Sequence, residues 1–412
     1  MKKIKTLQCI NCGRDHKLAE VKYTCASCGG NLQVIYDYNL IKKRLNYEVL
    51  KDNQDRTLWR YMEILPLAGF KMIPPVQVGW TPLYKAERLG SGAGVPNLYI
   101  KDEGRNPSGS LKDRAGAVVV SRARELKEKV IACASTGNAA SSLACLTGSL
   151  DLRTVIFVPE NAPAPKVAQL LVFGAVVIMV RGTYDAAFDL CLKAAAEYGW
   201  YNRSTGVNPF TREGKKTCAF EICEQMKWET PDKVLVPVGD GNMISGIWKG
   251  FVEFHRLGII ERLPQMVAVQ AEGSDAVKRA FESGGDIQSV SGETVADSIA
   301  VGTPRDGMAA VMSIRDSKGF AVSVSDAEIL AAIPEIAMGS NVFAEPAAAA
   351  TYAGLKKAVK EGKVKDNESV VLIISGNGLK DIASAMKSVG KPYLIQPDMA
   401  ELRKLVASNK LA

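Results

Sequence analysis

Several features that would assign this chain to a special class of protein are missing from its sequence. It has only 2 histidines in 412 residues, so nucleophilic catalysis built on histidine is set aside. No apolar run reaches the roughly 18 residues that a membrane-spanning helix requires. The start, MKKIKTLQCINCG, lacks the apolar core of a secretory signal. We therefore expect neither a membrane partner nor export.

The charged residues are spread evenly along the chain, although the net charge is positive. The net charge is +8, but no block of like charge and no stretch of interleaved basic and aromatic residues occurs. Nucleic-acid binding is therefore not supported. A modest basic excess fits an anionic small-molecule substrate.

Cysteine usage indicates a reducing compartment. Four of the 9 cysteines form two CxxC pairs, and the other five lie in apolar or helical contexts. We therefore expect a cytoplasmic protein with free thiols rather than a disulfide framework.

The paired cysteines predict a metal site in a small N-terminal unit. Cys9-x2-Cys12 and Cys25-x2-Cys28 can supply four thiolates to one tetrahedral Zn²⁺, which would stabilise a segment too short to fold alone. The alternative is a remnant that folds without metal. His16 is expected at the surface, because four sulfurs already complete the coordination shell.

From about residue 95 onward, short β-rich runs alternate with longer helical patterns. The 47% hydrophobic content is ample for two or three domains. Continuous apolar strands that alternate with helices predict an α/β fold with parallel sheets covered on both faces. In such folds, ligands bind at the carboxyl ends of the strands.

Lys112 is the first candidate for chemistry. It follows the turn Asn106-Pro-Ser-Gly-Ser and opens a helical stretch. A helix N-terminus lowers the pKa of a nearby ammonium, which favours a neutral, nucleophilic amine. Taken alone, the segment favours the simpler interpretation, in which the turn caps the helix and Lys112 is a solvated lysine of its first turn.

Three more strand-to-helix turns carry ligand-binding groups. Ser135-Thr-Gly-Asn138 follows the strand VIACA, Gly239-Asp240-Gly241-Asn242-Met243 follows KVLVPV, and Ser375-Gly-Asn-Gly follows VVLII. Backbone amides at such helix starts can hold a phosphate. Each turn taken singly is also compatible with an ordinary connection.

Together these segments resemble the fold-type-II pyridoxal-phosphate enzymes (tryptophan synthase β-like), and most closely the threonine synthase family. NPSGSLKDR is similar to the family's NPTGSFKDR, ACASTGNAAS to ACASTGNTAAS, and ISGNGLKD to TGHGLKD. GWTPL and FAEPAA are similar to the family motifs GxTPL and FxEPAsA. The resemblance covers nearly the whole chain and implies two parallel-sheet domains behind an N-terminal zinc-ribbon-like segment.

The resemblance implies roles for particular residues. Lys112 would be the catalytic lysine that binds pyridoxal 5'-phosphate covalently, Asn138 would bind the cofactor's 3′-oxygen, and Ser375 would bind its pyridine nitrogen. The cofactor phosphate would lie on Gly239, Asp240, Gly241, Asn242 and Met243. Since Asp240 would repel that phosphate, we expect its carboxylate to face away or to cap the next helix.

Substrate binding is where the sequence departs from the family. The family segment NSVNPHRLEG holds the substrate phosphate, and Thr211 stands at the position of its arginine. Lys101, Ser108 and Asn208 are substrate candidates by resemblance. Arg212 and Arg305 are candidates by charge.

The implied reaction is the conversion of O-phospho-L-homoserine and water to L-threonine and phosphate, by a carbon-oxygen lyase acting on phosphates. Two alternatives stay open: another fold-type-II reaction, such as serine/threonine deamination or β-replacement, and a non-catalytic cofactor-binding homologue. The family is usually homodimeric. The expected units are a zinc-ribbon-like segment at 1–38, a connector with the start of the large domain at 39–94, a small domain with Lys112 and the STGN turn at 95–208, and a large domain with the phosphate loop at 209–412.

Overall fold

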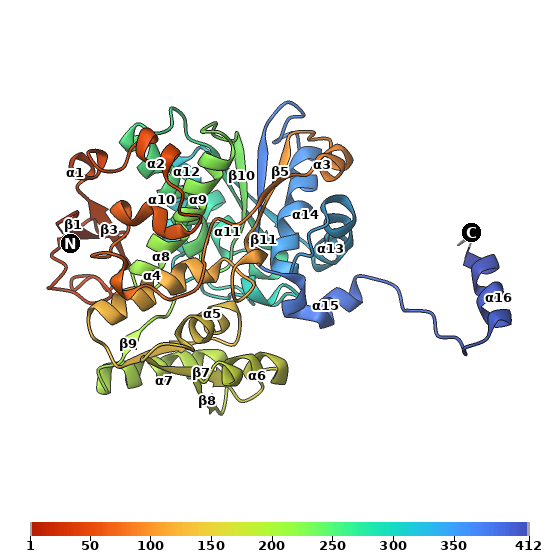
Figure 1. Cartoon of the computed structure of the whole chain (residues 1–412), viewed down its shortest axis with the longest axis horizontal. Coiled ribbons are helices and arrows are strands. Elements are labelled where there is room, and N and C mark those ends of the chain that lie inside the picture. Colours follow the sequence, from red (N-terminus) through yellow and green to blue (C-terminus); the bar gives the residue numbers. More distant parts are fainter. Residues whose placement is uncertain (1, 410–412) are drawn as a thin grey trace.

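Three sheets organise the computed structural model of the chain, which describes residues 2–409. A small antiparallel sheet lies at the N-terminus, a six-stranded sheet forms the centre of the large lobe, and a four-stranded sheet forms a second lobe (Figure 1). Among the described residues, no helix combines the length and apolar character needed to cross a membrane.

The N-terminal sheet is the ribbon that the cysteine pairs predict. Its strand order is β2-β1-β3, with antiparallel pairing throughout. Each CxxC pair lies in a loop of this sheet: Cys9 is the last residue of β1, and Cys25 lies in the loop that precedes β3. The strands are β1 (Ile4–Cys9), β2 (Asp15–His16) and β3 (Leu32–Tyr36).

The six-stranded sheet has the order β12-β11-β10-β13-β5-β4, and only its edge strand β4 is antiparallel. Its central strands are buried on both faces, as continuous apolar runs predict. Val234 and Val236 share an apolar cluster with α9 (Thr217–Gln225) and α10 (Asn242–Leu257) on one face, whereas Leu235 shares one with α13 (Asp326–Ser340) and α14 (Pro346–Lys360) on the other. The strands are β4 (Leu83–Lys85), β5 (Leu98–Asp102), β10 (Lys233–Pro237), β11 (Gln265–Ala271), β12 (Phe320–Val324) and β13 (Val370–Ile374).

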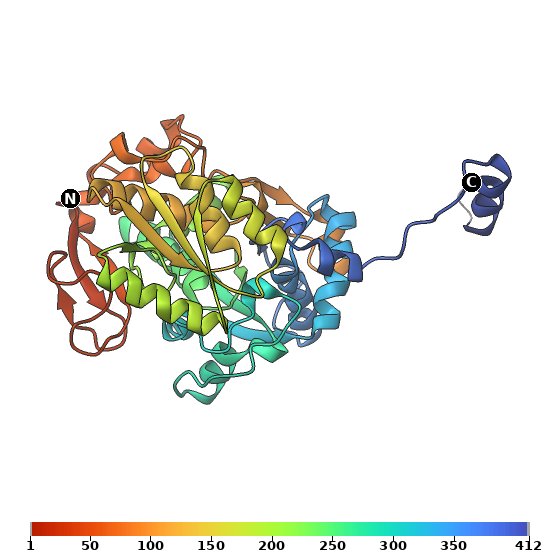
Figure 2. The same ribbon diagram turned by 90° about the horizontal axis from the view of Figure 1, so that it is seen from below.

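The four-stranded sheet is parallel, with the order β8-β7-β6-β9. Its helices α6 and α7 lie along the lower edge of the molecule in Figure 1, and Figure 2 shows this lobe face-on. The strands are β6 (Val130–Ala134), β7 (Arg153–Pro159), β8 (Val176–Val180) and β9 (Tyr201–Asn202), and the helices are α5 (Asn138–Thr147), α6 (Ala164–Val172) and α7 (Tyr184–Glu197).

The boundary between the two lobes differs from the expected one. Strand β5, which was assigned to the small domain, pairs with β13 in the six-stranded sheet, so the small sheet begins at β6. Strand order depends on which chain segments cross over, and the spacing of apolar runs in a sequence does not report that order.

Helix α4 (Lys112–Glu125) is held between the lobes. It packs against α5 of the small lobe and against α8 (Phe210–Lys215). The approach to α8 requires Gly214, because a Cβ atom there would lie 1.9 Å from the carbonyl oxygen of Arg114. This close contact fixes the start of α4, and with it Lys112.

Helices from the rest of the chain complete the large lobe. They are α1 (Tyr38–Lys42), α2 (Tyr47–Asp52), α3 (Glu87–Ala93), α9 (Thr217–Gln225), α10 (Asn242–Leu257), α11 (Ala276–Ser283), α12 (Gly307–Asp316), α13 (Asp326–Ser340), α14 (Pro346–Lys360) and α15 (Ile382–Lys387). Short 3-10 turns are η1 (Leu58–Ile64), η2 (Phe70–Met72), η3 (Glu103–Arg105), η4 (Glu272–Ser274), η5 (Asp297–Ile299) and η6 (Gly378–Asp381).

The C-terminal arm leaves the body of the molecule. It runs outward after α15 and ends in α16 (Met399–Asn409), which stands apart from both lobes (Figures 1 and 2). Residues 389–400 are exposed without a break, and Leu394 is 97% exposed.

Candidate active site

Lys112 begins α4 at the edge of a cavity between the lobes. Burial lowers the pKa of its ammonium; nearby Asp240 opposes the shift and Arg203 adds to it. The turn before it is closed by Asp113, whose carboxylate accepts hydrogen bonds from the backbone N–H and the hydroxyl of Ser108, both at 2.7 Å. The helix start therefore presents an amine that deprotonates more readily than a solvated lysine.

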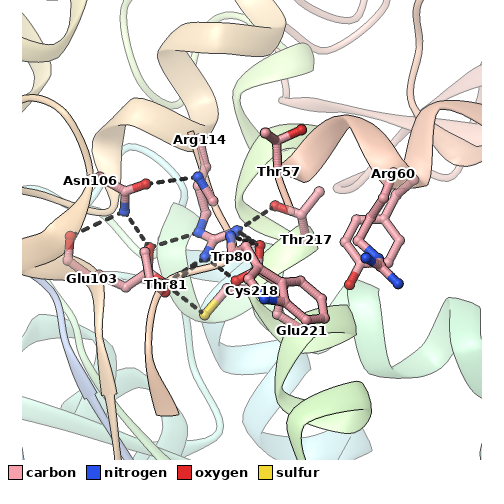
Figure 3. A network of polar contacts seen from close by, with 12 residues as sticks. Thr57, Arg60, Trp80, Thr81, Glu103, Asn106, Arg114, Thr217, Cys218 and Glu221 are labelled. Atoms are coloured by element: carbon pink, nitrogen blue, oxygen red, sulfur yellow. Dashed lines mark hydrogen bonds and ion pairs between the residues drawn. The ribbon is translucent and has the colours of Figure 1, made fainter. Parts of the chain in front are cut away.

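A buried charge cluster anchors this helix start from below (Figure 3). Arg114, two residues after Lys112, pairs with Glu103 and with Glu221, at 2.7 Å from Nε and Nη2 respectively. Lys101 completes the cluster with Nζ 2.7 Å from Glu221. Two cations and two carboxylates balance, and although burial opposes it, the pKa of Glu221 falls to about 2 because of Arg114 and Lys101. This balance makes the buried cluster tolerable, since an unpaired buried charge is costly.

Asn138 and Ser375 face each other across Glu345. The Asn138 amide donates to Glu345 Oε2 at 2.9 Å, and the Ser375 hydroxyl donates to Oε1 at 3.0 Å. Burial raises the pKa of the Glu345 carboxyl. The two residues expected on opposite sides of a cofactor ring therefore lie within reach of one central carboxyl group.

The glycine-rich turn Gly239–Met243 opens the 16-residue helix α10 beside Lys112. Gly241 has φ of +91°, and a Cβ atom there would lie 2.6 Å from the carbonyl oxygen of Asp306. The turn thus needs glycine for both its backbone angle and its close packing. Its amides stand at a helix N-terminus, where an anion is stabilised.

Asp240 does not cap α10, which was one of the two arrangements expected for it. The helix has no side-chain cap; instead, Asp240 accepts from the backbone N–H of Arg305 at 3.2 Å and lines the cavity. Burial raises the pKa of its carboxyl.

The donor set of this cavity fits pyridoxal phosphate. An amine, a phosphate-binding turn at a helix start, an amide and a hydroxyl converge on one space, and Lys112, Asn138, Ser375 and the whole turn line it. These are the groups that the cofactor's aldehyde, phosphate, ring oxygen and ring nitrogen require.

The residues predicted to bind the substrate phosphate lie in different places. Arg305 lines the outer part of the cavity, where it pairs with Asp185 at 3.3 Å. The other four do not line the cavities at this site, within the part of the chain that is described. They are Lys101, Ser108, Asn208 and Arg212.

Each of those four has its polar atoms engaged in the protein. The Arg212 guanidinium pairs with both carboxylate oxygens of Asp306, at 2.7 and 2.6 Å. Asn208 donates to the carbonyl of Asn202 at 2.8 Å and accepts from the backbone of Phe210. Their roles in substrate binding stay predictions, and they would require these contacts to break.

Sequence reasoning missed two buried cations at the site, Arg203 and Lys215. Lys215 lines the cavity that contains the Gly239–Met243 turn, here called the inner cavity, and donates to the side-chain oxygen of Asn242. Arg203 lines the adjoining cavity that contains Asp185 and Arg305, here called the outer cavity. Arg203 lies in the segment 202–214, whose departure from the family pattern was noticed, and Lys215 directly follows that segment. Nothing in the sequence marks them, because lysine and arginine are usually exposed.

The four paired cysteines meet in the ribbon. Their sulfur atoms all lie within 4.8 Å of one another, with Cys9 and Cys28 at 3.5 Å and Cys12 and Cys25 at 3.7 Å. A tetrahedral zinc with bonds of about 2.3 Å separates its sulfurs by about 3.8 Å, so the set has the dimensions of such a site.

His16 is not at the surface, contrary to our expectation. It is 7% exposed, and its Nε2 lies 3.2 Å from the sulfur of Cys25. The strand pairing of β2 with β1 turns it inward, so it serves the sulfur cluster as a hydrogen-bonding neighbour.

Comparisons with known proteins agree with this geometry. Residues 76–376 match the family described as pyridoxal-phosphate dependent enzyme. Threonine synthase from Methanocaldococcus jannaschii is 41% identical over 402 residues, covering 97% of this chain and 98% of that protein. Threonine synthase from Methanosarcina acetivorans is 40% identical over 403 residues, with the same shares covered. Among solved structures, threonine deaminase isoform 2 from Solanum lycopersicum superimposes with a TM-score of 0.64 at 25% identity, covering 76% of this chain and 88% of that one.

Proposed function

The chain belongs to the pyridoxal-phosphate dependent enzymes and, within them, to the threonine synthases, and from this membership we propose that it converts O-phospho-L-homoserine and water to L-threonine and phosphate. The observation that carries the proposal is the convergence of Lys112, the Gly239–Met243 turn, Asn138 and Ser375 on one cavity. A binding homologue without catalysis would not need a lysine of lowered pKa at that place.

We propose that the cofactor phosphate lies on the Gly239–Met243 turn, with Lys215 as its cation. Asn138 and Ser375 would hold the two sides of the ring, after Glu345 yields the contacts it makes with them. When bound, pyridoxal phosphate supplies an aldehyde that takes up an amine and a ring that accepts electron density. A hydroxyl partner such as Ser375 leaves that ring a mild electron sink, which suits elimination and replacement.

Lys112 has two functions in this proposal. Its Nζ binds the cofactor between turnovers, and once substrate has displaced it, the free amine removes and returns a proton at the substrate Cα. Its lowered pKa supports both functions, because a neutral amine is the nucleophile and the base. Burial between the lobes excludes bulk water from this proton transfer.

A structural zinc ion is proposed for Cys9, Cys12, Cys25 and Cys28. The tetrahedral dimensions of the sulfur set support it, and so do the hydrogen bonds that backbone N–H groups of Cys12 and Ser27 donate to Cys9 and Cys25. Four free thiolates also support a cytoplasmic location, where such ligands stay reduced.

The activity is tested by incubating the holoenzyme separately with O-phosphohomoserine, threonine and serine. We expect phosphate and threonine in equal amounts from the first and no keto acid from the others. Ammonia and a keto acid from threonine or serine, without phosphate release from O-phosphohomoserine, would favour the deaminase alternative instead.

Lys112→Ala is the matched control for that assay. It should fold and lose turnover by about 10³-fold or more, since both proposed functions of the amine disappear. Borohydride reduction and peptide mapping should attach the cofactor to Lys112 in the wild type only. Attachment to Lys215 instead would contradict the assignment.

A further inference from the structure

Arg203 lies at the carboxyl edge of the four-stranded sheet, directly after β9. Its backbone N–H continues the ladder to β6 by donating to the carbonyl of Ala132 at 2.8 Å. The neighbouring strand β6 leads directly into Ser135 and Thr136, which line the same outer cavity as Arg203. The guanidinium is therefore fixed beside the turn that opens α5, at the edge where α/β folds bind ligands.

The charge of Arg203 is unmatched. The residue is fully buried, yet its Nε and Nη2 have no hydrogen-bond partner, and Nη1 donates only to the hydroxyl of Thr205 at 3.3 Å. The thiol of Cys133 lies beside it, a weak and neutral acceptor. Within residues 2–409, no carboxylate forms an ion pair with it.

Other buried cations of this protein show what a structural arginine or lysine does here. Arg114 has two carboxylates, Arg212 has both oxygens of Asp306, and Lys216 has Glu213 and Glu253 at 2.7 Å. A buried cation without such a partner destabilises the ligand-free fold. Its position in a cavity that Lys112 also lines indicates that an anion pairs with it when the site is filled.

The two cavities share Lys112, Asn138, Thr205 and Asp240, but they differ in the other cations that line them. The glycine-rich turn and Lys215 line the inner cavity, whereas Arg203 lines the outer one together with Arg305. Thr205 lines both, and it accepts from Arg203. A second anionic group, placed outward from Lys112, is what the substrate of the proposed reaction carries.

We propose that Arg203, assisted by Thr205, binds the phosphate of the substrate and thereby selects a phosphorylated amino acid. This inference rests on the proposed function and assigns its substrate-phosphate cation. It differs from the expectation that Arg212 or Arg305 takes this part, because Arg212 is already paired and Arg305 lies at the partly exposed rim.

The test compares Arg203→Met and Arg203→Lys holoenzymes with the wild type. With O-phosphohomoserine, Arg203→Met should lose about 30- to 1000-fold in kcat/KM, mostly through KM, because a charge-assisted contact to a dianion is removed. Arg203→Lys should recover at least about ten-fold of that loss. Arg153→Met, which removes an exposed arginine at the start of β7, is the matched control and should behave as the wild type.

Stability separates a ligand-binding role from a structural one. Without added anions, Arg203→Met should melt at the same temperature as the wild type or higher, since an unpaired buried charge is gone. Millimolar inorganic phosphate should raise the Tm of the wild-type holoenzyme and leave that of Arg203→Met unchanged. A structural arginine would instead lower the Tm when replaced, with or without phosphate.

Three outcomes overturn the inference: an unchanged kcat/KM in Arg203→Met, a lowered Tm without restoration by the lysine variant, or loss of the cofactor on dialysis. The last would place Arg203 at the cofactor phosphate. If the wild type releases no phosphate from O-phosphohomoserine, the proposed function fails, and the phosphate-dependent Tm still decides whether Arg203 is an anion site.

Discussion

Lys215 is a fully buried ammonium that has an amide oxygen, but no carboxylate, for a partner. Its pKa is held well below the usual value, first by burial and then by the nearby charges of Lys112 and Arg203. A bound phosphate would reverse that balance, because a dianion beside the ammonium favours its protonated form. The buried Lys215 ammonium therefore destabilises the fold when no phosphate is bound, and a bound phosphate removes that destabilisation.

Replacement of Lys215 by Met should weaken cofactor binding about 10- to 100-fold, the range for one charge-assisted hydrogen bond. Titration of the apoprotein with pyridoxal phosphate measures the dissociation constant directly. The Tm of the ligand-free variant should not fall, since no ion pair is broken.

Lys216→Met provides the matched control one residue further along. It removes one of the two lysines, Lys216 and Lys249, that pair with the carboxylates of Glu213 and Glu253, so its Tm should fall while the folded protein keeps its cofactor affinity. Equal cofactor affinity in Lys215→Met and the wild type would remove Lys215 from the phosphate site.

At the scale of elements, α4 is positioned by the charge cluster beneath it rather than by a helix cap. The helix has no side-chain cap, yet Arg114 ties its first turn to Glu103 on η3 and Glu221 on α9. The direction of Lys112 thus depends on residues far away in the sequence. The same cluster includes Lys101, whose Nζ pairs with Glu221.

Glu221→Gln should lower the free energy of unfolding by about 3–5 kcal/mol, because Arg114 and Lys101 lose their shared charge partner. It should also change the response to acid. The pKa of Glu221 is about 2 in the fold against 4.5 as the ordinary value, so its contribution is complete above about 4.5 and is lost as the pH falls toward 2.

Denaturant titrations between pH 7 and pH 3 would measure both effects. The wild type should lose stability steadily below about pH 4.5, and Glu221→Gln should lose less over the same interval. Parallel pH profiles for the two proteins would mean that Glu221 does not carry this charge in the fold.

The zinc-ribbon-like segment is the second element with a defined connection to the site. Asn31 donates to the carbonyl of Arg305 at 2.7 Å and to Asp306 at 2.9 Å, and Asp306 also holds the side chain of Asn242. The ribbon therefore supports the end of the glycine-rich turn, although none of its residues lines the cavity.

Cys25→Ser should lose the metal and unfold the ribbon, because one ligand of four is gone. Turnover should fall by no more than about ten-fold, the scale of a few lost hydrogen bonds. Metal analysis of the purified proteins and proteolysis within residues 2–37 measure the two effects. A wild type purified under reducing conditions without zinc would contradict the metal assignment.

At the scale of the whole molecule, the C-terminal arm stands out because residues 389–400 are exposed and do not pack on either lobe (Figures 1 and 2). The arm extends beyond the edge of both lobes (Figure 2). Its apolar side chains Leu394 and Met399 are 97% and 59% exposed. Surface of this kind is normally covered by a partner. We propose that the arm packs on a second copy of the chain and holds a homodimer.

Removal of the arm after Gly390 should convert the dimer to a monomer while leaving the melting temperature of each lobe nearly unchanged. Light scattering across a concentration series would report the mass of both proteins. A full-length chain that stays monomeric at high micromolar concentration would exclude this arrangement.

The sequence by itself determined the type of fold, the four binding turns and the sulfur cluster. Continuous apolar strands report burial on both faces, and glycine with serine or asparagine at a strand end reports a turn into a helix. These are local properties, so the Lys112 helix start, the Gly239–Met243 turn and the two CxxC knuckles could be read directly.

Only the tertiary structure decided which cations line the cavities. Lys101, Ser108, Asn208 and Arg212 were candidates by position or charge, but distant carboxylates and backbone groups occupy their polar atoms. Arg203 and Lys215 carry no local signal and emerge only because the fold buries them without carboxylate partners. The charge state of a buried side chain depends on neighbours brought together by packing, and that information lies in the fold rather than in the order of residues.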